Sequence, residues 1–326
     1  WDKYFIQTAD IDASDTENWN DNGSGGYYGF SPIGNSSNYF TGSYDGGGNT
    51  IDNLFIDRPS TNDIGLFGNI DGAEIENIGL INVNITGQYS VGALVGETSS
   101  ASVSNCYSTG EISGTSSVGG LLGESNNTSV SDSYSSCSVT GSSYRVGGLI
   151  GCISSGSGQT INNCYSAGSV SGERETGGLI GIISTYTDNP EVTVENCYTT
   201  SDVTRVSGSH SPEFGSFIGT NGEDGGGFSS EESGADISYC YATGDVVYDG
   251  DDPTDKGFVG SEGGPTLSYT ANFFDSEASN QSSATGATGK TTAEMTTDAL
   301  VYDYTDNIYL AAGWDFVGES NNGSDD

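Results

Sequence analysis

A short glycine-bounded apolar box recurs along this chain, and the repetition restricts the possible folds more than any other feature. The box consists of an opening glycine, two or three mainly apolar residues and a closing glycine. Copies lie at 65–68, 92–96, 120–123, 148–151 and 178–181, with looser copies at 215–219 and 257–260. The closing glycines are spaced by 28, 27, 28, 30, 38 and 41 residues, with insertions in the later repeats. A regular period of this length is typical of stacked repeat architectures.

A second box lies between the first ones and contains an Asn-Cys-Tyr core. It spans 103–110 and 161–168, with weaker copies at 194–198 and 237–241 and related segments at 75–79 and 130–134. Gly, Ser, Thr and Asn separate the short strand-like runs, and no useful length has helical periodicity. We therefore predict an all-β parallel β-helix, in which each coil of about 28 residues holds three short strands and three turns.

Stacked coils place like residues over like, so the second box predicts three columns of side chains. An inward column holds Ile78, Cys106, Ser133, Cys164, Cys197, Cys240 and Phe273. The preceding column is an asparagine ladder at a bend, a structural device, made of Asn77, Asn105, Asn163, Asn196 and Asn272 with Asp132 and Tyr239 between them. The following column is an outward aromatic stripe of Tyr107, Tyr134, Tyr165, Tyr198 and Tyr241, ending at Phe274. This stripe is either a surface for glycan or subunit packing or a stack that only stabilises the sheet.

The six cysteines permit two interpretations. Those of the inward column share it with apolar residues and are expected to be buried free thiols. If any of these pair, Cys164 and Cys197 lie in neighbouring coils. Cys137 and Cys152 lie off the column and are better candidates for a disulfide. A zinc site is not expected, since there is no close pair of cysteines and the single histidine is distant.

The formal net charge is −38, from 45 acidic and 7 basic residues. Such a surface repels nucleic acid and anionic lipid, and no apolar run approaches the length of a membrane span. An acidic surface can hold divalent cations or keep a protein solvated in brine. The sharpest acidic cluster consists of Asp245, Asp249, Asp251, Asp252 and Asp255, and it is either a calcium site, with the last four as candidate ligands, or a solvated loop.

Catalytic residues are not assigned. With 45 carboxylates, no pair can be singled out for glycoside hydrolysis. Arg145, Arg174 and Arg205 have a spacing near that of the repeat. They predict either a basic stripe that could bind an acidic glycan or local ion pairs with neighbours such as Glu173 and Glu175.

The two boxes resemble the GLUG-motif family, named for its Gly-Leu-any-Gly core, over residues 61–275. The opening segment 1–60 and the closing segment 276–326 are similar to those that flank such repeats, and we expect them to cap the two ends. The resemblance implies a right-handed β-helix on bacterial or archaeal surface proteins, and no single activity. We therefore expect an extracellular structural protein that self-assembles through its ends or faces. The alternatives are an adhesive, glycan-binding module and a polysaccharide-cleaving enzyme.

Overall fold

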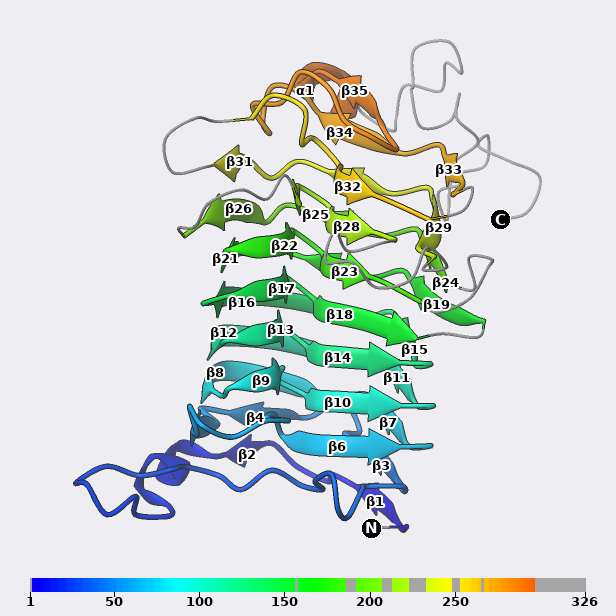
Figure 1. The fold of residues 1–326 in the computed structure, drawn as a ribbon. Helices are drawn as coiled ribbons and strands as arrows, with labels where there is room; N and C mark the ends of the chain where they lie inside the picture. The colour runs from blue at the N-terminus through cyan, green and yellow to red at the C-terminus, as the bar shows by residue number, and fades with distance from the viewer. Residues whose placement is uncertain are drawn as a thin grey trace.

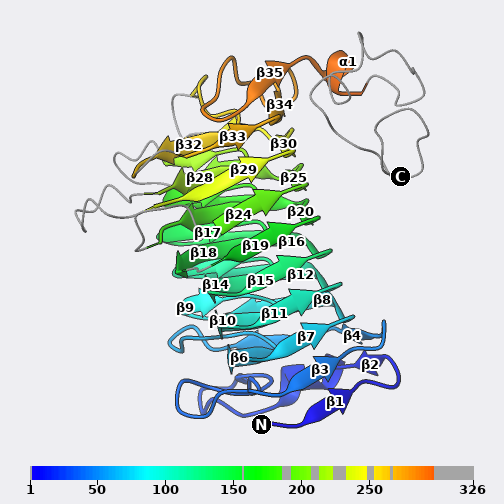
Figure 2. The ribbon, with the colours of Figure 1, turned by 90° about the vertical axis from the view of Figure 1, so that its right-hand side faces the viewer.

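The chain forms a right-handed parallel β-helix whose axis runs vertically in Figure 1. The structure is a computed structural model that describes residues 2–155, 158–185, 192–206, 213–222, 233–247, 253–264 and 267–296. The chain runs from left to right along the front of Figure 1 and from front to back along the side that faces the viewer in Figure 2, while it climbs from the N-terminus. This path confirms the fold class and the handedness that the sequence predicts.

Two of the parallel sheets form the front and one side of the helix. In the described chain the nine-stranded sheet, which faces the viewer in Figure 2, contains β1 (Tyr4–Ile6), β3 (Ser43–Asp45), β7 (Glu74–Glu76), β11 (Ser102–Ser104), β15 (Ser129–Ser131), β19 (Gln159–Asn162), β24 (Val192–Glu195), β29 (Ala235–Ser238) and β33 (Tyr269–Thr270). The seven-stranded sheet contains β6 (Phe67–Asp71), β10 (Val95–Ser99), β14 (Leu122–Asn126), β18 (Ile150–Ser155), β23 (Ile180–Ile183), β28 (Ile218–Asn221) and β32 (Val259–Glu262).

Two further sheets close the cross-section. The larger contains β2 (Ile11–Asp12), β4 (Thr50–Asp52), β5 (Phe55–Asp57), β8 (Gly79–Thr86), β12 (Tyr107–Gly114), β16 (Tyr134–Gly141), β20 (Tyr165–Ser166), β21 (Ser169–Gly172), β25 (Tyr198–Thr199), β26 (Asp202–Arg205), β30 (Tyr241–Ala242), β31 (Val246–Val247), β34 (Phe273–Asp275) and β35 (Thr288–Lys290). The smaller contains β9 (Tyr89–Val91), β13 (Ser116–Gly119), β17 (Tyr144–Gly147), β22 (Arg174–Gly177) and β27 (Phe214–Gly215).

A regular coil therefore has four strands, and the prediction of three strands per coil is wrong. One such coil runs through β10, β11, β12 and β13 before β14 begins the next. The additional bend separates strands such as β9 and β10 and coincides with the glycine-bounded box at 92–96. The glycines of the box interrupt the strand there, so one expected strand becomes two that belong to different sheets.

The core is a thin column of inward side chains that repeat from coil to coil. In the nine-stranded sheet, Val103 pairs with Ile75 on one side and Val130 on the other, and all three are at most 1% exposed. Strand alternation turns their neighbours Ser102 and Ser104 outward. A chain with only 33% hydrophobic residues can build this core because each coil needs few inward positions.

The segment before residue 61 contributes the first strands of two sheets and packs beside β6. Strands β1 to β5 continue two of the sheets, and η1 (Ser14–Asn18) follows β2. The intervening chain lies under β6, where Phe40 packs on Phe67 with ring centroids 4.9 Å apart. At the other end, β35 adds to β34, and α1 (Thr292–Met295) begins with a capping box between Thr291 and Glu294. Residues 297–326 of the predicted closing segment lie outside the described residues.

Candidate functional site

The predicted aromatic stripe is a continuous stack of tyrosine rings. Neighbouring ring centroids lie 5.0 Å (Tyr107–Tyr134), 4.5 Å (Tyr134–Tyr165), 4.7 Å (Tyr165–Tyr198) and 5.0 Å (Tyr198–Tyr241) apart. Their planes are within 6° of parallel. The stack arises because these residues occupy the same register position in β12, β16, β20, β25 and β30.

Stacking leaves the ring edges, rather than the ring faces, open to solvent. Each inner tyrosine has a neighbouring ring on both faces, and below Tyr107 lies Gly79, where an added Cβ would come within 2.3 Å of the Tyr107 ring. A sugar that stacks on aromatic faces therefore finds these faces covered. Burial raises the pKa of Tyr134, Tyr165 and Tyr198, and raises that of Tyr241 to about 12, with a further contribution from Tyr198.

The last coil is displaced by one residue from the predicted register. Phe273, rather than Phe274, pairs with Tyr241 and continues the tyrosine position. Asn272 occupies the cysteine position, where its Oδ1 accepts a hydrogen bond from the Cys240 backbone N–H at 3.0 Å. Asn272 is therefore not a member of the asparagine ladder, and Ala271 takes that place with φ of 54°. The run Asn-Phe-Phe is compatible with both registers. In the observed register, Asn272 supplies an acceptor for the Cys240 N–H.

The ladder residues share a left-handed backbone conformation. The backbone angle φ lies between 52° and 57° at Asn77, Asn105, Asn163, Asn196 and Tyr239. At Asp132 it is 51°. Asn and Asp tolerate this region better than most residues do. Side-chain hydrogen bonds between coils are present at three places: Asn77 donates to Asp45, Asn163 to Asp132 and Asn196 to Asn162, over 3.0 to 3.1 Å. The feature that the ladder residues share is therefore the left-handed backbone conformation, and side-chain hydrogen bonds between coils accompany it at some positions.

The cysteine column also makes hydrogen bonds, although its members are buried as predicted. The backbone N–H groups of Cys164 and Cys197 each donate to the Sγ of the next coil at 3.4 Å. Ser133 fills the same role with its Oγ, which accepts from the Cys106 N–H at 3.1 Å. The column therefore satisfies backbone donors at a buried bend, which purely apolar residues could not do.

The cysteines are all free and buried in the structure, including Cys137 and Cys152. Burial raises the pKa of Cys106 to about 12 and raises those of Cys137, Cys164 and Cys197 as well. These thiols are consequently inert under ordinary conditions. The expectation of free thiols in the column is confirmed, and the alternative disulfide between Cys137 and Cys152 is absent.

Most of the predicted acidic loop lies outside the described residues, and the predicted arginine stripe does not form. Asp249, Asp251 and Asp252 lie outside the described residues, and Asp255 is an exposed residue 3.9 Å from the Lys256 ammonium. The register pairs Arg174 with Tyr144, which places Glu175 opposite Arg145. Arg205 belongs to another sheet, in β26. The stripe is therefore wrong, and the alternative of local ion pairs involving Glu175 is correct.

A more polar arrangement flanks the glycine-bounded box, at the bend that we call the glycine corner. Each corner joins the end of a strand of the smaller sheet, such as β9, to the start of a strand of the seven-stranded sheet, such as β10. Its closing glycine packs against the backbone of the preceding coil. A Cβ on Gly123 would meet the Val91 nitrogen at 2.4 Å, and one on Gly151 would meet the Val118 nitrogen at 2.5 Å. Only glycine allows the coils to approach so closely at this bend.

Two positions of each coil meet at the glycine corner. The entry position lies two residues before the opening glycine in the first two copies and three before it in the next three. It has positive φ in each of them, at Asp63, Ser90, Ser117, Arg145 and Glu175. The exit position lies one residue after the closing glycine, and pairing aligns Asn69, Glu97, Glu124, Cys152, Ile182 and Thr220. The Ser90 Oγ donates to the Glu124 Oε2 at 3.3 Å, so entry and exit positions of neighbouring coils are in contact.

The lower coils place three carboxylates at this corner: Asp63, Glu97 and Glu124. Glu97 accepts from the Nδ2 of Asn69 at 3.0 Å, and Glu124 accepts from the Oγ of Ser154 at 2.9 Å. Burial raises the pKa of Asp63 and of Glu97. The neighbouring charge of Glu124 adds to both shifts, and that of Asp63 adds to the shift of Glu97. The corner is therefore an electrostatically unfavourable place for its own carboxylates.

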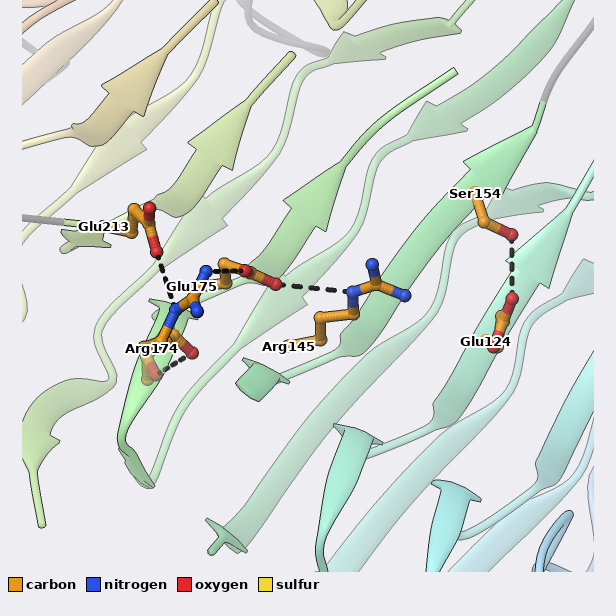
Figure 3. A network of polar contacts seen from close by, with 7 residues as sticks. Glu124, Arg145, Ser154, Arg174, Glu175 and Glu213 are labelled. Carbon is orange, nitrogen blue, oxygen red and sulfur yellow. Dashed lines mark hydrogen bonds and ion pairs between the residues drawn. The ribbon is translucent and has the colours of Figure 1, made fainter. Parts of the chain in front are cut away.

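The upper coils replace this acidic arrangement by an ion-pair network (Figure 3). Glu175, only 1% exposed, accepts from Arg145 at 3.3 Å and from Arg174 at 3.1 Å. Arg174 also contacts Glu213 at 3.4 Å. In the view of Figure 3, Arg145 lies between Glu175 and the Glu124–Ser154 pair. Two arginines thus compensate the buried carboxylate of Glu175.

The sequence contains a signal for this corner that the interpretation of the boxes overlooked. Aligning the closing glycines shows that the next residue is Asn69, Glu97 or Glu124 in the first three copies, Cys152 or Ile182 in the next two, and Thr220 or Ser261 in the last two. A change from polar to apolar at one register position marks a place where neighbouring coils have different environments. The glycines of the box mark the repeat, and the residues beside them distinguish its copies.

Comparison with known proteins supports the interpretation of the repeat. The family described as the GLUG motif matches residues 87–113, which begin just before one glycine corner and run through the following Asn-Cys-Tyr box. The chain carries the GLUG motif. Its glycine corner is the part of the coil in which the motif glycines have a steric role.

Two similar proteins extend this comparison. A stretch of 112 residues is 46% identical to Halomucin of Haloquadratum walsbyi, and it covers 32% of this chain and 1% of that protein. The chain thus matches a very small part of the length of this relative. A crystal structure of a candidate immunoglobulin A1 protease from Bacteroides ovatus superimposes with a TM-score of 0.58 over 82% of this chain and 78% of that one, at 22% identity. At this identity the likeness shows the fold alone. In the described part of the chain, no helix is long and apolar enough to cross a membrane.

Proposed function

We propose that this chain is a rigid structural segment of an extracellular surface protein and that it associates end to end with further copies of itself. The GLUG motif and the Halomucin match support a surface location, and the continuous parallel stacking supports a rod that holds its shape. In this proposal the chain has no catalytic role, and its partners are other copies of the chain.

The observation that carries the proposal is the strand edge that β1 and β2 present within the described residues. Strands β1 and β2 are terminal in their sheets, and within the described residues each pairs on one side only. Three apolar side chains are exposed there: Tyr4 at 61%, Ile6 at 56% and Ile11 at 44%. An exposed strand edge with apolar side chains is a ready template for pairing with another chain. A further parallel coil would satisfy the free backbone groups and cover these side chains.

The charge of the chain sets the condition under which this association occurs. Two rods with a net charge of −38 each repel one another strongly in dilute salt. The Debye length falls from about 30 Å at 0.01 M to about 3 Å at 1 M ionic strength, so salt removes most of this repulsion. We expect end-to-end association in molar salt and separate rods in dilute buffer.

Electron microscopy and sedimentation of the whole chain at both salt concentrations test the proposal. We expect rods several times the length of one chain at high salt, and short rods for the double variant Ile6→Lys/Ile11→Lys. The matched control is Val206→Lys, since Val206 is also 44% exposed but lies after β26, far from β1. Single rods of wild-type protein under all conditions would refute end-to-end assembly, as would unchanged assembly of the double variant.

Glycan binding is the second candidate, and one cavity favours it. The cavity has a volume of about 540 Å³ and lies between the segment before residue 61 and the first glycine corner. Its lining is rich in hydroxyl and amide groups, and its Arg58 also lies 5.3 Å from the ring centroid of Tyr28, which is 41% exposed. A glycan array tests this candidate: retention that Arg58→Ala abolishes would support it, and an array without hits would remove it.

A further inference from the structure

Two hairpins in the segment before residue 61 contain the triplet Asn-x-Ser/Thr, the acceptor sequence for attachment of a sugar to an asparagine nitrogen. Because the triplet is short, its presence alone does not make a site. The chain has seven copies, which begin at Asn22, Asn35, Asn84, Asn126, Asn127, Asn280 and Asn322. A copy is a credible acceptor where it lies in a surface loop of an exported protein. The structure therefore distinguishes the copies.

The triplet at Asn35 lies at the tip of a tight hairpin. Asn35 and Asn38 pair antiparallel, and every residue from 35 to 39 is exposed. The Asn35 Oδ1 accepts the backbone N–H groups of Ser37 and Asn38, both at 3.0 Å. No acceptor contacts the Asn35 Nδ2 in the described part of the chain. The backbone thus binds the oxygen of the amide and leaves its nitrogen available.

The triplet at Asn22 has the same arrangement in a second hairpin. Asp21 and Tyr27 pair antiparallel on its two sides. The Asn22 Oδ1 accepts the N–H groups of Ser24 at 2.9 Å and Gly26 at 3.2 Å, and Ser24 is exposed. Among the described residues, the Asn22 Nδ2 has no acceptor either. Both hairpins therefore hold an asparagine by its oxygen, two residues before an exposed serine.

The other triplets differ because their hydroxyl residues are engaged or buried. The Thr86 hydroxyl lies 2.9 Å from a hydroxyl of the next coil, and the Ser129 Oγ accepts a backbone N–H of the next coil at 3.3 Å. Thr128 is completely buried. Near the upper end, the Ser282 hydroxyl donates to a carbonyl of another loop at 2.9 Å. The triplet that begins at Asn322 lies outside the described residues.

Exposed aromatic rings lie close in sequence to both hairpins. Trp19 is 47% exposed, and the exposed fractions of Tyr27, Tyr28 and Tyr39 lie between 39% and 42%. Tyr27 closes the hairpin of Asn22, and Tyr39 directly follows the other hairpin. The C–H groups of a sugar can pack against such rings and shield their apolar surface from water. The surroundings of both hairpins therefore suit a covalently attached sugar.

We propose that these two hairpins are N-glycosylation sites, in which the Nδ2 of Asn22 and the Nδ2 of Asn35 each carry a sugar. The donor is an activated sugar phosphate, and a transferase catalyses the step. The bond from Nδ2 to the sugar C1 forms while the bond from C1 to the phosphate oxygen breaks. The phosphate leaves with the electron pair, and Nδ2 releases one proton. The two N–H groups on each Oδ1 favour negative charge on that oxygen as the proton leaves. Modification depends on the extracellular location proposed above and not on end-to-end association.

Incubation of the folded, unmodified whole chain with an oligosaccharyltransferase and its lipid-linked sugar donor tests the proposal. Peptide mass spectrometry measures the occupancy of each triplet. Ser24→Ala and Ser37→Ala remove the acceptor hydroxyls and keep both asparagines, while Ser37→Thr keeps a hydroxyl. The matched control is Ser36→Ala, which removes an exposed hydroxyl from the middle position of the same triplet. Heat-unfolded chain, in which every triplet is accessible, serves as the control for transferase activity.

We expect the folded chain to be modified at Asn22 and Asn35 with roughly tenfold higher occupancy than at Asn84, Asn126 or Asn127, and unfolding to remove this preference. Ser37→Ala should lose the sugar at Asn35 only, whereas Ser36→Ala and Ser37→Thr should keep it. The proposal is overturned if the folded chain stays unmodified at both hairpins under conditions that modify the unfolded chain. Preferential modification of the triplets within the coils overturns it as well. Neither result bears on end-to-end association, which sedimentation of the unmodified chain measures separately.

Discussion

Tyr134 lies flat on Tyr165, with ring centroids 4.5 Å apart and planes 6° from parallel, although 30 residues separate them in the chain. The contact exists because β16 and β20 pair in parallel, with Tyr134 directly opposite Tyr165. The separation of the rings is about that of neighbouring β-strands, so the geometry of the sheet itself produces the stack. The same relationship recurs along the tyrosine column, and it makes the column a sensitive reporter of register.

Removing an inner ring of this column should destabilise the protein more than removing an end ring. Tyr165→Ala loses two stacking contacts, each worth about 0.5–1.5 kcal/mol beyond area burial. We therefore expect a loss of about 1–3 kcal/mol from stacking, and about half of that for Tyr107→Ala, which has one stacked tyrosine neighbour. Guanidinium unfolding of both variants measures this. Equal losses would contradict a role for stacking beyond burial.

Alkaline pH should destabilise the fold through the same column. The folded chain favours the neutral form of Tyr134, Tyr165, Tyr198 and Tyr241, so their pKa values are raised above the ordinary value of about 10. Above that pH the unfolded chain releases protons that the folded chain retains, and stability falls as pH rises towards the Tyr241 pKa of about 12. Below pH 10 these groups contribute no pH dependence.

Tyrosinate absorbance and unfolding free energy, followed together from pH 9 upward, check this expectation. Over this pH range, Tyr241→Phe should lose less stability than wild type, because it lacks the tyrosine of the column whose pKa is raised to about 12. A Tyr241→Phe protein with an unchanged pH profile would show that the column does not cause the loss.

The ladder predicts different effects of two small substitutions at one exposed position. Asn105 has φ of 52°, in the left-handed region, where a residue with a Cβ and no compensating side chain is disfavoured by about 1–2 kcal/mol. Asn105→Ala should therefore lower the unfolding free energy by about 1 kcal/mol, while Asn105→Gly should change it little. Ser102→Ala, at an exposed strand position, controls for a general effect of alanine. An alanine variant at 105 that is as stable as the glycine variant would indicate that the bend does not have this conformation.

The cysteine column predicts that serine is a better substitute than alanine inside the core. Cys197→Ala leaves the buried Cys164 N–H without its acceptor, at a cost of about 1–3 kcal/mol. Cys197→Ser keeps an acceptor, as Ser133 does naturally for Cys106. Thermal unfolding of the two variants should place the serine variant higher. An apolar column would give the reverse order, because burying a hydroxyl without a partner is unfavourable.

The repeat allowed most of the fold to be predicted, because stacking imposes one register on every copy. The tyrosine column is outward and continuous as its spacing predicted, and the cysteines are buried and free. The error at Asn272 shows the limit of this reasoning. Two registers fit the pattern equally well there, and the difference lies in which side chain supplies an acceptor to the Cys240 N–H.

The glycine corner could not be predicted from the boxes alone, for a geometric reason. The repeat shows which residues are equivalent, but it does not show that the entry and exit positions of neighbouring coils meet, as Ser90 and Glu124 do. That contact depends on a bend that divides one expected strand into two. The predicted arginine stripe is wrong for a related reason. The spacing of Arg145 and Arg174 is close to the repeat length, but the two residues are one position out of register.

A disulfide cross-link across two coils tests the stacked register most directly. Ser138 and Ser169 pair across β16 and β21, with their Oγ atoms 3.1 Å apart at an exposed position. Neighbouring strands place Cα atoms within the range that a disulfide spans, whereas Ser136 lies two residues out of register, beyond that range. The account predicts that Ser138→Cys/Ser169→Cys cross-links readily under mild oxidation while Ser136→Cys/Ser169→Cys does not. Equal cross-linking of the two pairs, or faster cross-linking of the second, would contradict it.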